Sequence, residues 1–429
     1  MIRILFVWVL KGIITGMLMI LTSTATTGQV FSLGDLLDSI PAGNPNLRMY
    51  DYDIRSMDEA ARGAKSWMAP EVGAGFFMTP YNPKYIKPME DAMGNTEPGM
   101  GQFMISAQQM LPNRRRQNAE YNYMTAMSAG ERERRSNALN QLNADLKKNY
   151  YQWVVRRKKL RVLDENEKLL RFMIQSAELR YKNGLAKINA YYKAKAALGN
   201  VRRMRAMVES ESDQKRIMIN TILNRDRLAV FDIDTSIKPK DYSKSLPDTN
   251  SIIANRSDLK AVEKDIVLNE LRIKNERAKL LPEFGIRYEH MIGLAQQPGQ
   301  FTLMGMVRIP FAPWAARMSK ANMESYRWKT ESLQQQRQMI LNEASGMAHG
   351  TLNEIRARSR QVELYESTIL PAIRNNFLTT QIAYDQNTEV LFMLLDAWEA
   401  LNMTQLEYLD TFEQLLTSQA ELERVLEIR

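Results

Sequence analysis

The segment that decides the fold begins with Leu281-Pro282-Glu283-Phe284-Gly285 and continues as a run of alternating residues. In this run, apolar side chains alternate with side chains predicted to lie on the other face. The apolar set is Phe284, Ile286, Tyr288 and Ile292, and the other set is Gly285, Arg287, Glu289 and Met291. After the turn at 296–299 the alternation resumes, as Phe301, Leu303, Val307 and Ile309 against Thr302, Met304, Met306 and Arg308. A period of two residues is typical of strands with one apolar face. We therefore predict a β-hairpin at about 282–311.

The same pattern occurs once more, 212 positions earlier. Pro70-Glu71 and Gly73 correspond to Pro282-Glu283 and Gly285 at this offset, and Tyr181 recurs as Tyr384 after the offset has drifted by a few residues. The earlier copy has its own apolar face, formed by Val72, Ala74, Phe76 and Met78 and then by Phe103, Ile105, Ala107 and Leu111. The chain is therefore a duplication. We expect a first repeat at 29–226 with a hairpin at about 69–112, a linker or equatorial segment at 227–254, and a second repeat at 255–429.

Long helices fill most of the remaining sequence. No proline occurs between Asn113 and Lys238, and Pro371 is the only proline from Trp314 to the last residue. A single helix over 113–180 would be ~100 Å long at ~1.5 Å per residue. In the last segment the residues Leu391, Leu394, Trp398, Leu401, Tyr408, Phe412, Leu415, Leu422 and Leu426 follow steps of three and four, with Gln405 and Gln419 in the gaps. This heptad stripe predicts coiled-coil packing.

Composition limits the function. The chain has 429 residues, no cysteine, two histidines and a net charge of +9. Basic and acidic residues are interleaved, which argues against nucleic acid, and no nucleophile, metal-ligand spacing or phosphate loop surrounds either histidine. Residues 1–28 resemble a signal peptide, because the ten apolar residues at 12–21 are too few to cross a ~30 Å hydrocarbon core as a helix. An uncleaved membrane anchor is the alternative. We predict a protein without enzymatic activity and without a cofactor.

The strands imply an assembly. Strands of about ten residues with one apolar face suit a membrane β-barrel, although a soluble hairpin packed on a core has the same pattern. A barrel needs at least about eight strands and cannot leave open edges in lipid, so four strands from one chain are too few. Three copies would form a 12-stranded β-barrel that continues into a long α-helical barrel. The predicted fold class is mainly α with a membrane β-barrel whose apolar face is in contact with lipid.

The order of these elements resembles the TolC family of outer-membrane efflux proteins, with some likeness to its heavy-metal branch at Ile309-Pro310-Phe311-Ala312-Pro313-Trp314. The resemblance covers nearly the whole chain, and 255–285 is its most family-like stretch. It implies a homotrimeric channel in the outer membrane of a Gram-negative bacterium, with a long periplasmic portion. Such a channel passes cargo from a periplasmic membrane-fusion adaptor and an inner-membrane efflux pump. A soluble periplasmic coiled-coil adaptor or scaffold is the alternative function.

The resemblance also implies a periplasmic gate. Its tip turns fall at Asn183, Gly184 and Asn387, residues that tolerate positive φ. The gate residues are Tyr384, Asn387, Met393 and Asp396. Asp396 matches one of two acidic positions that narrow the mouth in the family, while Met393 replaces the other. An ion pair between Asp396 and Lys193 is the alternative for this carboxylate.

The methionine content of the chain suggests which cargo the channel could carry. The chain has 27 methionines, and thioethers are soft ligands for Cu(I) or Ag(I). The candidate metal ligands are Met89, Met93, Met100 and Met104, while hydrophobic packing is the alternative role. The strand residues predicted to face the lumen are Arg287, Glu289, Met291, Met304, Met306 and Arg308.

Overall fold

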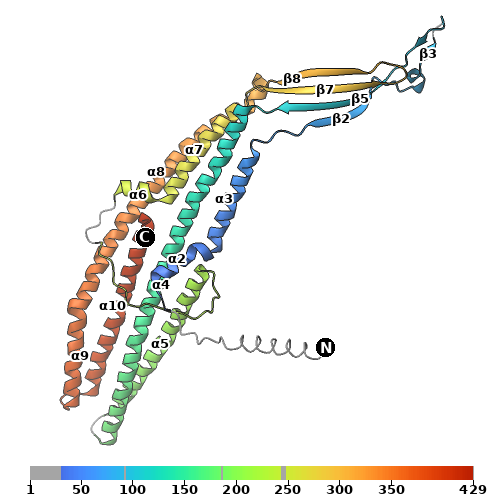
Figure 1. Cartoon of the computed structure of the whole chain (residues 1–429). Helices are drawn as coiled ribbons and strands as arrows, with labels where there is room; N and C mark the ends of the chain where they lie inside the picture. Colours follow the sequence, from blue (N-terminus) through green and yellow to red (C-terminus); the bar gives the residue numbers. More distant parts are fainter. Residues whose placement is uncertain (1–29, 91–92, 185–186, 243–247, 429) are drawn as a thin grey trace, which may run out of the picture.

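The computed structural model describes residues 30–428, apart from 91–92, 185–186 and 243–247. The described chain is elongated, with β-strands at one end and the turns between long helices at the other (Figure 1). The predicted signal peptide at 1–28 lies outside the described residues. Among the helices that are described, none has the length and apolar character needed to cross a membrane.

The strand end is one antiparallel sheet of four strands. Its order is β2 (Glu71–Phe77), β5 (Gln102–Leu111), β7 (Glu283–Gly293) and β8 (Gln300–Arg308). Each repeat supplies one hairpin, as predicted, and β5 pairs with β7 to join them. The strands β2 and β8 therefore form the two edges of the sheet within this chain.

A long excursion connects β2 to β5. It contains the 3-10 turn η1 (Pro83–Ile86) and a small hairpin of β3 (Met89–Glu90) and β4 (Thr96–Glu97). This excursion projects beyond the far end of the main strands (Figure 1). The corresponding loop between β7 and β8 is short and turns through Ala295 and Gln296, both at positive φ.

Next to the sheet, the helices α3 (Pro45–Gly63), α4 (Arg114–Lys182), α7 (Ser257–Ala278) and α8 (Pro313–Leu364) lie side by side (Figure 1). The short helix α2 (Leu33–Gly43) precedes α3. The 69 residues of α4 form one helix, as the absence of proline predicts. Asn113 caps its start, because its side-chain oxygen accepts hydrogen bonds from the backbone N–H groups of Arg115 and Arg116.

In the lower half, two helical hairpins pack together. One is α4 with α5 (Ile188–Ile222), and the other is α9 (Leu370–Asp385) with α10 (Leu391–Leu426). A π-helical turn at Tyr365–Ile369 joins α8 to α9, just before Pro371. Proline cannot donate the regular backbone hydrogen bond of an α-helix, which fits the wider turn here.

Two apolar cores run along the helices. The first fills the middle of the molecule around Leu146, Tyr150, Val154, Leu352 and Phe412. The second fills the lower hairpins around Leu170, Leu198, Leu394 and Trp398. The predicted heptad stripe of α10 lies in these cores: Leu391, Leu394, Trp398, Leu401, Phe412, Leu415, Leu422 and Gln419 are buried. Burial of this stripe against partner helices is confirmed, with Tyr408 and Leu426 only partly buried.

The two repeats are tied together at the middle of the molecule. The short strand β1 (Val30–Phe31) pairs in parallel with β6 (Asp232–Ile233), and α6 (Thr249–Asn255) leads into α7. The carboxylate of Glu427 accepts hydrogen bonds from the N–H and hydroxyl of Ser257, at 2.6 and 2.7 Å. In return Arg256 donates to the carbonyl of Val425. The end of α10 and the start of α7 thus cap each other.

Candidate functional site

The register of the sheet divides its strand residues between two faces. Directly paired residues of antiparallel strands point to the same side. One face holds Val72, Phe76, Phe103, Ile105, Leu111, Phe284, Ile286, Tyr288, Ile292, Phe301, Leu303 and Val307. We call it the apolar face, and all of these side chains except that of Phe103 are exposed in the single chain, Phe301 by 70%. An exposed apolar patch of this extent indicates contact with lipid or another protein.

The opposite side, which we call the polar face, holds the six residues predicted to face the lumen: Arg287, Glu289, Met291, Met304, Met306 and Arg308. Four of its charged side chains form ion pairs. Arg287 contacts Glu289 at 2.5 Å, and Arg308 contacts Glu283 at 3.0 Å. Arg116, from the first turn of α4, also contacts Glu283. Both carboxylates are buried, and burial of a charge requires such partners.

The methionine candidates are distributed over several segments. Met89 lies in β3 and Met93 in the turn after it, while Met100 precedes β5. Met104 lies within β5, opposite Met291 of β7. The structure thus pairs Met104 with a strand methionine. The described residues contain no group of three or more His, Asp or Glu side chains that could hold a metal ion.

The two tip turns occur where the sequence predicts them. Gly184 has φ of 68° and Asn387 has φ of 62°. Asn183 was expected to share this conformation, but its φ is −89°. The left-handed position falls on Gly184 because glycine adopts it without the Cβ clash that asparagine would meet.

Tyr384, a predicted gate residue, is held by α4. Its side chain is buried, and its hydroxyl lies 3.1 Å from the hydroxyl of Ser176. Arg180 donates a 2.9 Å hydrogen bond to the carbonyl of Tyr384, and its guanidinium lies 4.0 Å from the ring centroid. Sequence reasoning missed Ser176 and Arg180, because they lie more than 200 positions from Tyr384. We call these three residues the tip latch.

Asp396 lies one turn into α10 and contacts Lys193 of α5 at 2.5 Å. The ion pair that was the alternative for Asp396 is therefore present. The ammonium of Lys193 also lies 3.5 Å above the ring of Phe392. Met393, the remaining gate residue, is exposed beside Phe392. Carboxylate and ammonium are both partly exposed, so solvent weakens their attraction.

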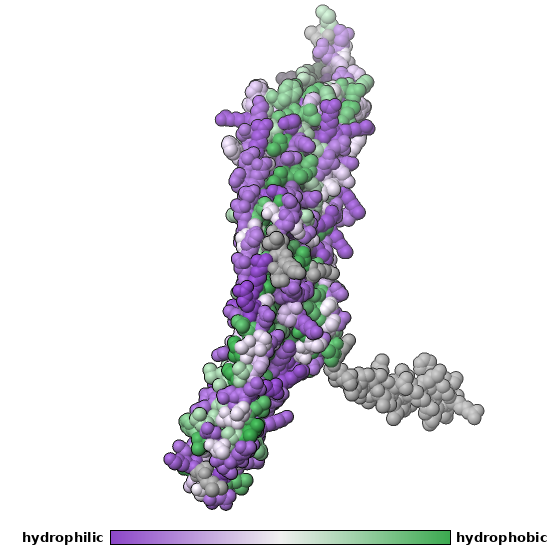
Figure 2. All heavy atoms as spheres, turned by 90° about the vertical axis from the view of Figure 1, so that its left-hand side faces the viewer, coloured by the Kyte–Doolittle hydropathy of each residue, from purple (hydrophilic) through white to green (hydrophobic). Residues whose placement is uncertain are grey.

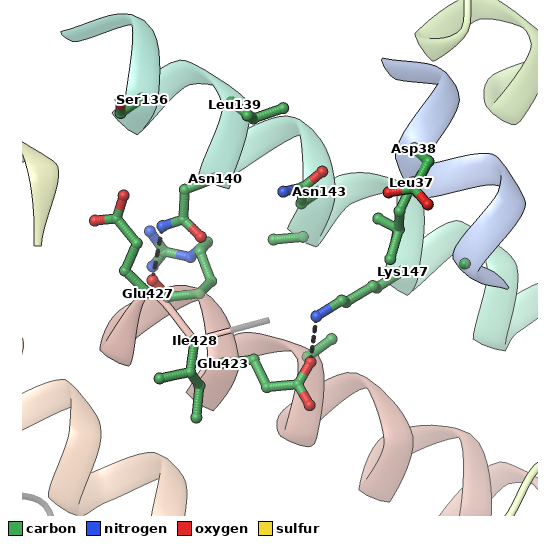
Figure 3. A pocket seen from close by; sticks show the side chains of 14 residues that line it. Leu37, Asp38, Ser136, Leu139, Asn140, Asn143, Lys147, Glu423, Glu427 and Ile428 are labelled. Atoms are coloured by element: carbon green, nitrogen blue, oxygen red, sulfur yellow. Dashed lines mark hydrogen bonds and ion pairs between the residues drawn. The ribbon is translucent and has the colours of Figure 1, made fainter. Parts of the chain in front are cut away.

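A polar cluster lies at the middle of the molecule, beside a cavity of about 290 Å³ between α2, α4 and the end of α10 (Figure 3). Lys147 contacts Glu423 at 2.5 Å, and both are buried. Glu423 also accepts hydrogen bonds from Lys240 and the Tyr242 hydroxyl. Nearby, hydrogen bonds from Arg424 and Lys148 lower the pKa of Glu421 to about 2, against the opposing effect of burial.

Comparison with known proteins relates this architecture to outer-membrane channels. Residues 36–225 match the model of the family described as outer membrane efflux protein. No curated protein matches the chain by sequence. The fold resembles that of the outer-membrane channel OprN, with a TM-score of 0.71, 15% identity, and 92% of this chain and 89% of that chain covered.

Two further structures share this fold. CusC gives a TM-score of 0.70 at 14% identity and covers 92% of this chain and 91% of its own. The Campylobacter jejuni CmeC outer membrane channel gives 0.71 at 12% identity and covers 92% and 85%. The sequence match lies in the first repeat, and the shared fold extends over both repeats. Residues 36–225 are therefore similar to the outer membrane efflux protein family, and the chain has the mainly helical fold with strand hairpins of the outer-membrane channels OprN and CmeC.

Proposed function

We propose that the protein is the passive exit duct of a tripartite efflux system and works as a homotrimer. The observation that carries this proposal is the four-stranded sheet, which has two open edges and one exposed apolar face. Unpaired backbone groups in hydrocarbon cost several kcal/mol each, so β2 and β8 need partners there. The β8 edge of one copy can pair with the β2 edge of the next.

A closed ring of three copies has twelve strands, which exceeds the minimum of about eight for a membrane barrel. The apolar face then meets lipid, and the polar face with its Arg–Glu pairs lines the lumen. The helices continue the same wall away from the membrane, because they extend from every strand of the sheet (Figure 1).

The face of the helical portion drawn in Figure 2 fits a location in water. It is mostly hydrophilic, with separate hydrophobic patches between the hydrophilic residues. A periplasmic adaptor and an inner-membrane pump would deliver cargo to its tips. The adaptor or scaffold alternative gives no role to a sheet that exposes an entire apolar face. The proposal of copper or silver as cargo depends on the methionines alone, because thioethers are soft ligands for these ions.

We propose that the gate lies at the tips: Tyr384 is in the last turn of α9, Asn387 in the connection that follows, Met393 in the first turn of α10, and Asp396 one turn further along that helix. Tyr384 is fixed to α4 by the tip latch. Release of the latch would free the α9–α10 hairpin to move away from α4. The pore would then widen at its periplasmic end.

Strand closure can be tested with engineered thiols, because the chain has no cysteine of its own. Gly75→Cys on β2 is combined in turn with Thr302→Cys, Met304→Cys and Met306→Cys on β8. After oxidation in detergent, at least one pair should give covalent trimers on a denaturing gel. Ser106→Cys on the interior strand β5 replaces Gly75→Cys in the control and should give none.

The same preparations decide between the two functions. A duct requires detergent for extraction from outer membranes and conducts ions in a planar bilayer. Monomeric, freely soluble protein without cross-links or conductance would contradict the proposal and favour the adaptor.

A further inference from the structure

The strand methionines are distributed unevenly between the two faces of the sheet. The main sheet contains five methionines: Met104, Met110, Met291, Met304 and Met306. The strand register places all five on the polar face and none on the apolar face. The polar face has 20 of the strand positions and the apolar face 17, so the difference in size does not account for this.

This placement conflicts with a purely hydrophobic role. Methionine that serves as a flexible apolar side chain belongs on the face rich in Phe, Ile, Leu and Val. On the polar face the methionines stand instead among Gln102, Ser106, Gln108, Arg287, Glu289 and Thr302. Phe77, at the end of β2, is the one other large apolar side chain on the polar face of these four strands. On a face with so few other large apolar side chains, the thioether sulfur is the property that distinguishes these residues.

Four of the five form two cross-strand pairs. Met104 and Met291 are directly opposite each other on neighbouring strands, where side chains stand about 5 Å apart at Cβ. Met110 and Met306 flank Gly285 on its two sides in the same row of the sheet. A Cβ on Gly285 would lie 2.6 Å from the sulfur of Met110 and 3.1 Å from the methyl carbon of Met306. Both side chains therefore lean over the glycine towards each other.

The two pairs lie at different heights. Gly285 is near the start of β7, beside the helices, whereas Met291 is near its far end. Met304, opposite Arg287, stands between them. The charged neighbours are engaged with one another, as Arg287 with Glu289 and Arg308 with Glu283. The thioethers are thus the soft donors on this face, and they follow the direction from the helices to the outer end of the strands.

We propose that the polar-face methionines are binding sites for a soft monovalent cation, Cu(I) or Ag(I). The inner site is the pair Met110 and Met306 over Gly285, and the outer site is the pair Met104 and Met291. Thioethers bind such ions without deprotonation and discriminate against Mg²⁺ and Ca²⁺, which prefer oxygen. Separate weak sites along one wall suit passage, because an ion must both enter and leave. The location of these sites inside a lumen rests on the proposed function, whereas the binding itself does not.

The probe is Ag(I), which avoids copper redox chemistry, titrated calorimetrically into the full-length protein in detergent and chloride-free buffer. A variant with all five strand methionines replaced by leucine keeps the approximate volume and removes the sulfurs. We expect it to lose at least tenfold in Ag(I) affinity or to lose sites. The double variants Met104→Leu/Met291→Leu and Met110→Leu/Met306→Leu should each lose part of the binding, which covers the case in which the fivefold variant fails to fold.

The matched control replaces five exposed helix methionines by leucine: Met207, Met218, Met318, Met339 and Met403. It should bind Ag(I) like the unmodified protein, and X-ray absorption at the silver edge should show sulfur neighbours in both. Equal binding by the strand variants and the unmodified protein would overturn the proposal, as would an equal loss in the control. Bilayer conductance is recorded separately, so that failure to form a channel refutes the duct and leaves the metal titration to decide the sites.

Discussion

The tip latch provides a quantitative test of the gate. In Arg180→Gln the charge-assisted hydrogen bond to the carbonyl of Tyr384 and the guanidinium stack on its ring are both lost. A hydrogen bond from a charged donor contributes about 1.5–3 kcal/mol, and a partly exposed cation–π contact contributes about 0.5–1 kcal/mol. Because Arg180 is only half-buried, we take the low end of both ranges. The latch would then lose about 2 kcal/mol.

A loss of about 2 kcal/mol changes a two-state equilibrium roughly 30-fold, since each 1.4 kcal/mol is a factor of ten. If the latched tip is the closed state, the ratio of open to closed channels should rise by about that factor. The assay is ion conductance in planar bilayers, with open probability recorded at the single-channel level. Ser176→Ala, which removes the partner of the Tyr384 hydroxyl, should shift the same equilibrium by a smaller amount.

The control is Lys182→Gln. It also removes one positive charge from the last turn of α4, but Lys182 pairs with Glu178 on its own helix. This variant should leave the open probability unchanged. If Arg180→Gln and Lys182→Gln both conduct like the unmodified protein, the contacts around Tyr384 do not hold the gate.

Three further predictions concern charged groups. Asp396→Asn should reduce the cation preference of the channel, because it removes the carboxylate. Lys193→Met should increase the cation preference, because it frees the Asp396 carboxylate from its partner. Unchanged reversal potentials in both variants would exclude Asp396 from the gate. Glu423→Leu should destabilise the protein by about 3–5 kcal/mol by leaving Lys147 buried without its partner. Lys147→Met/Glu423→Leu should recover part of this loss but not all of it, because Lys240 and Tyr242 also donate to Glu423. In thermal unfolding this corresponds to about 1 °C per kcal/mol for a chain of this length, and a double variant no better than Glu423→Leu would show that the pair is not coupled. The lowered pKa of Glu421 stabilises the folded state fully when the pH is above the ordinary pKa of about 4.5, and this stabilisation is lost as the pH falls towards 2. Glu421→Gln should therefore lower the melting temperature at pH 7 and have no effect near pH 2.

Periodicity in the sequence predicted the parts of the fold that depend on a repeated pattern. The alternation in 284–309 placed Arg287 and Met304 on one face of the sheet, and the register bears this out. The heptad steps in α10 predicted its buried stripe. Both patterns are local, because every residue in them is judged against neighbours a few positions away.

Contacts between distant segments were not predictable in this way. The approach of the Met110 and Met306 side chains over Gly285 depends on the register that places these three residues side by side on three strands. A register shift of one residue in a strand would have moved all of its side chains to the other face of the sheet. The contact of Arg180 with Tyr384 depends on how two hairpins dock. The π-helical turn before Pro371 likewise has no distinctive sequence beyond the proline itself.

The charge of the two helical hairpins explains how the duplicated halves recognise each other. Residues 147–222 contain 19 Lys or Arg and seven Asp or Glu, whereas residues 365–427 contain two and 11. Ion pairs join the two hairpins along their contact: Lys147–Glu423, Lys148–Glu421, Arg156–Glu413, Lys159–Asp410 and Lys193–Asp396. Two copies of the same hairpin would instead bring like charges together and repel. The net charge of +9 therefore conceals a strongly basic and a strongly acidic hairpin, and this opposition favours packing of the first-repeat hairpin against the second-repeat hairpin within the chain.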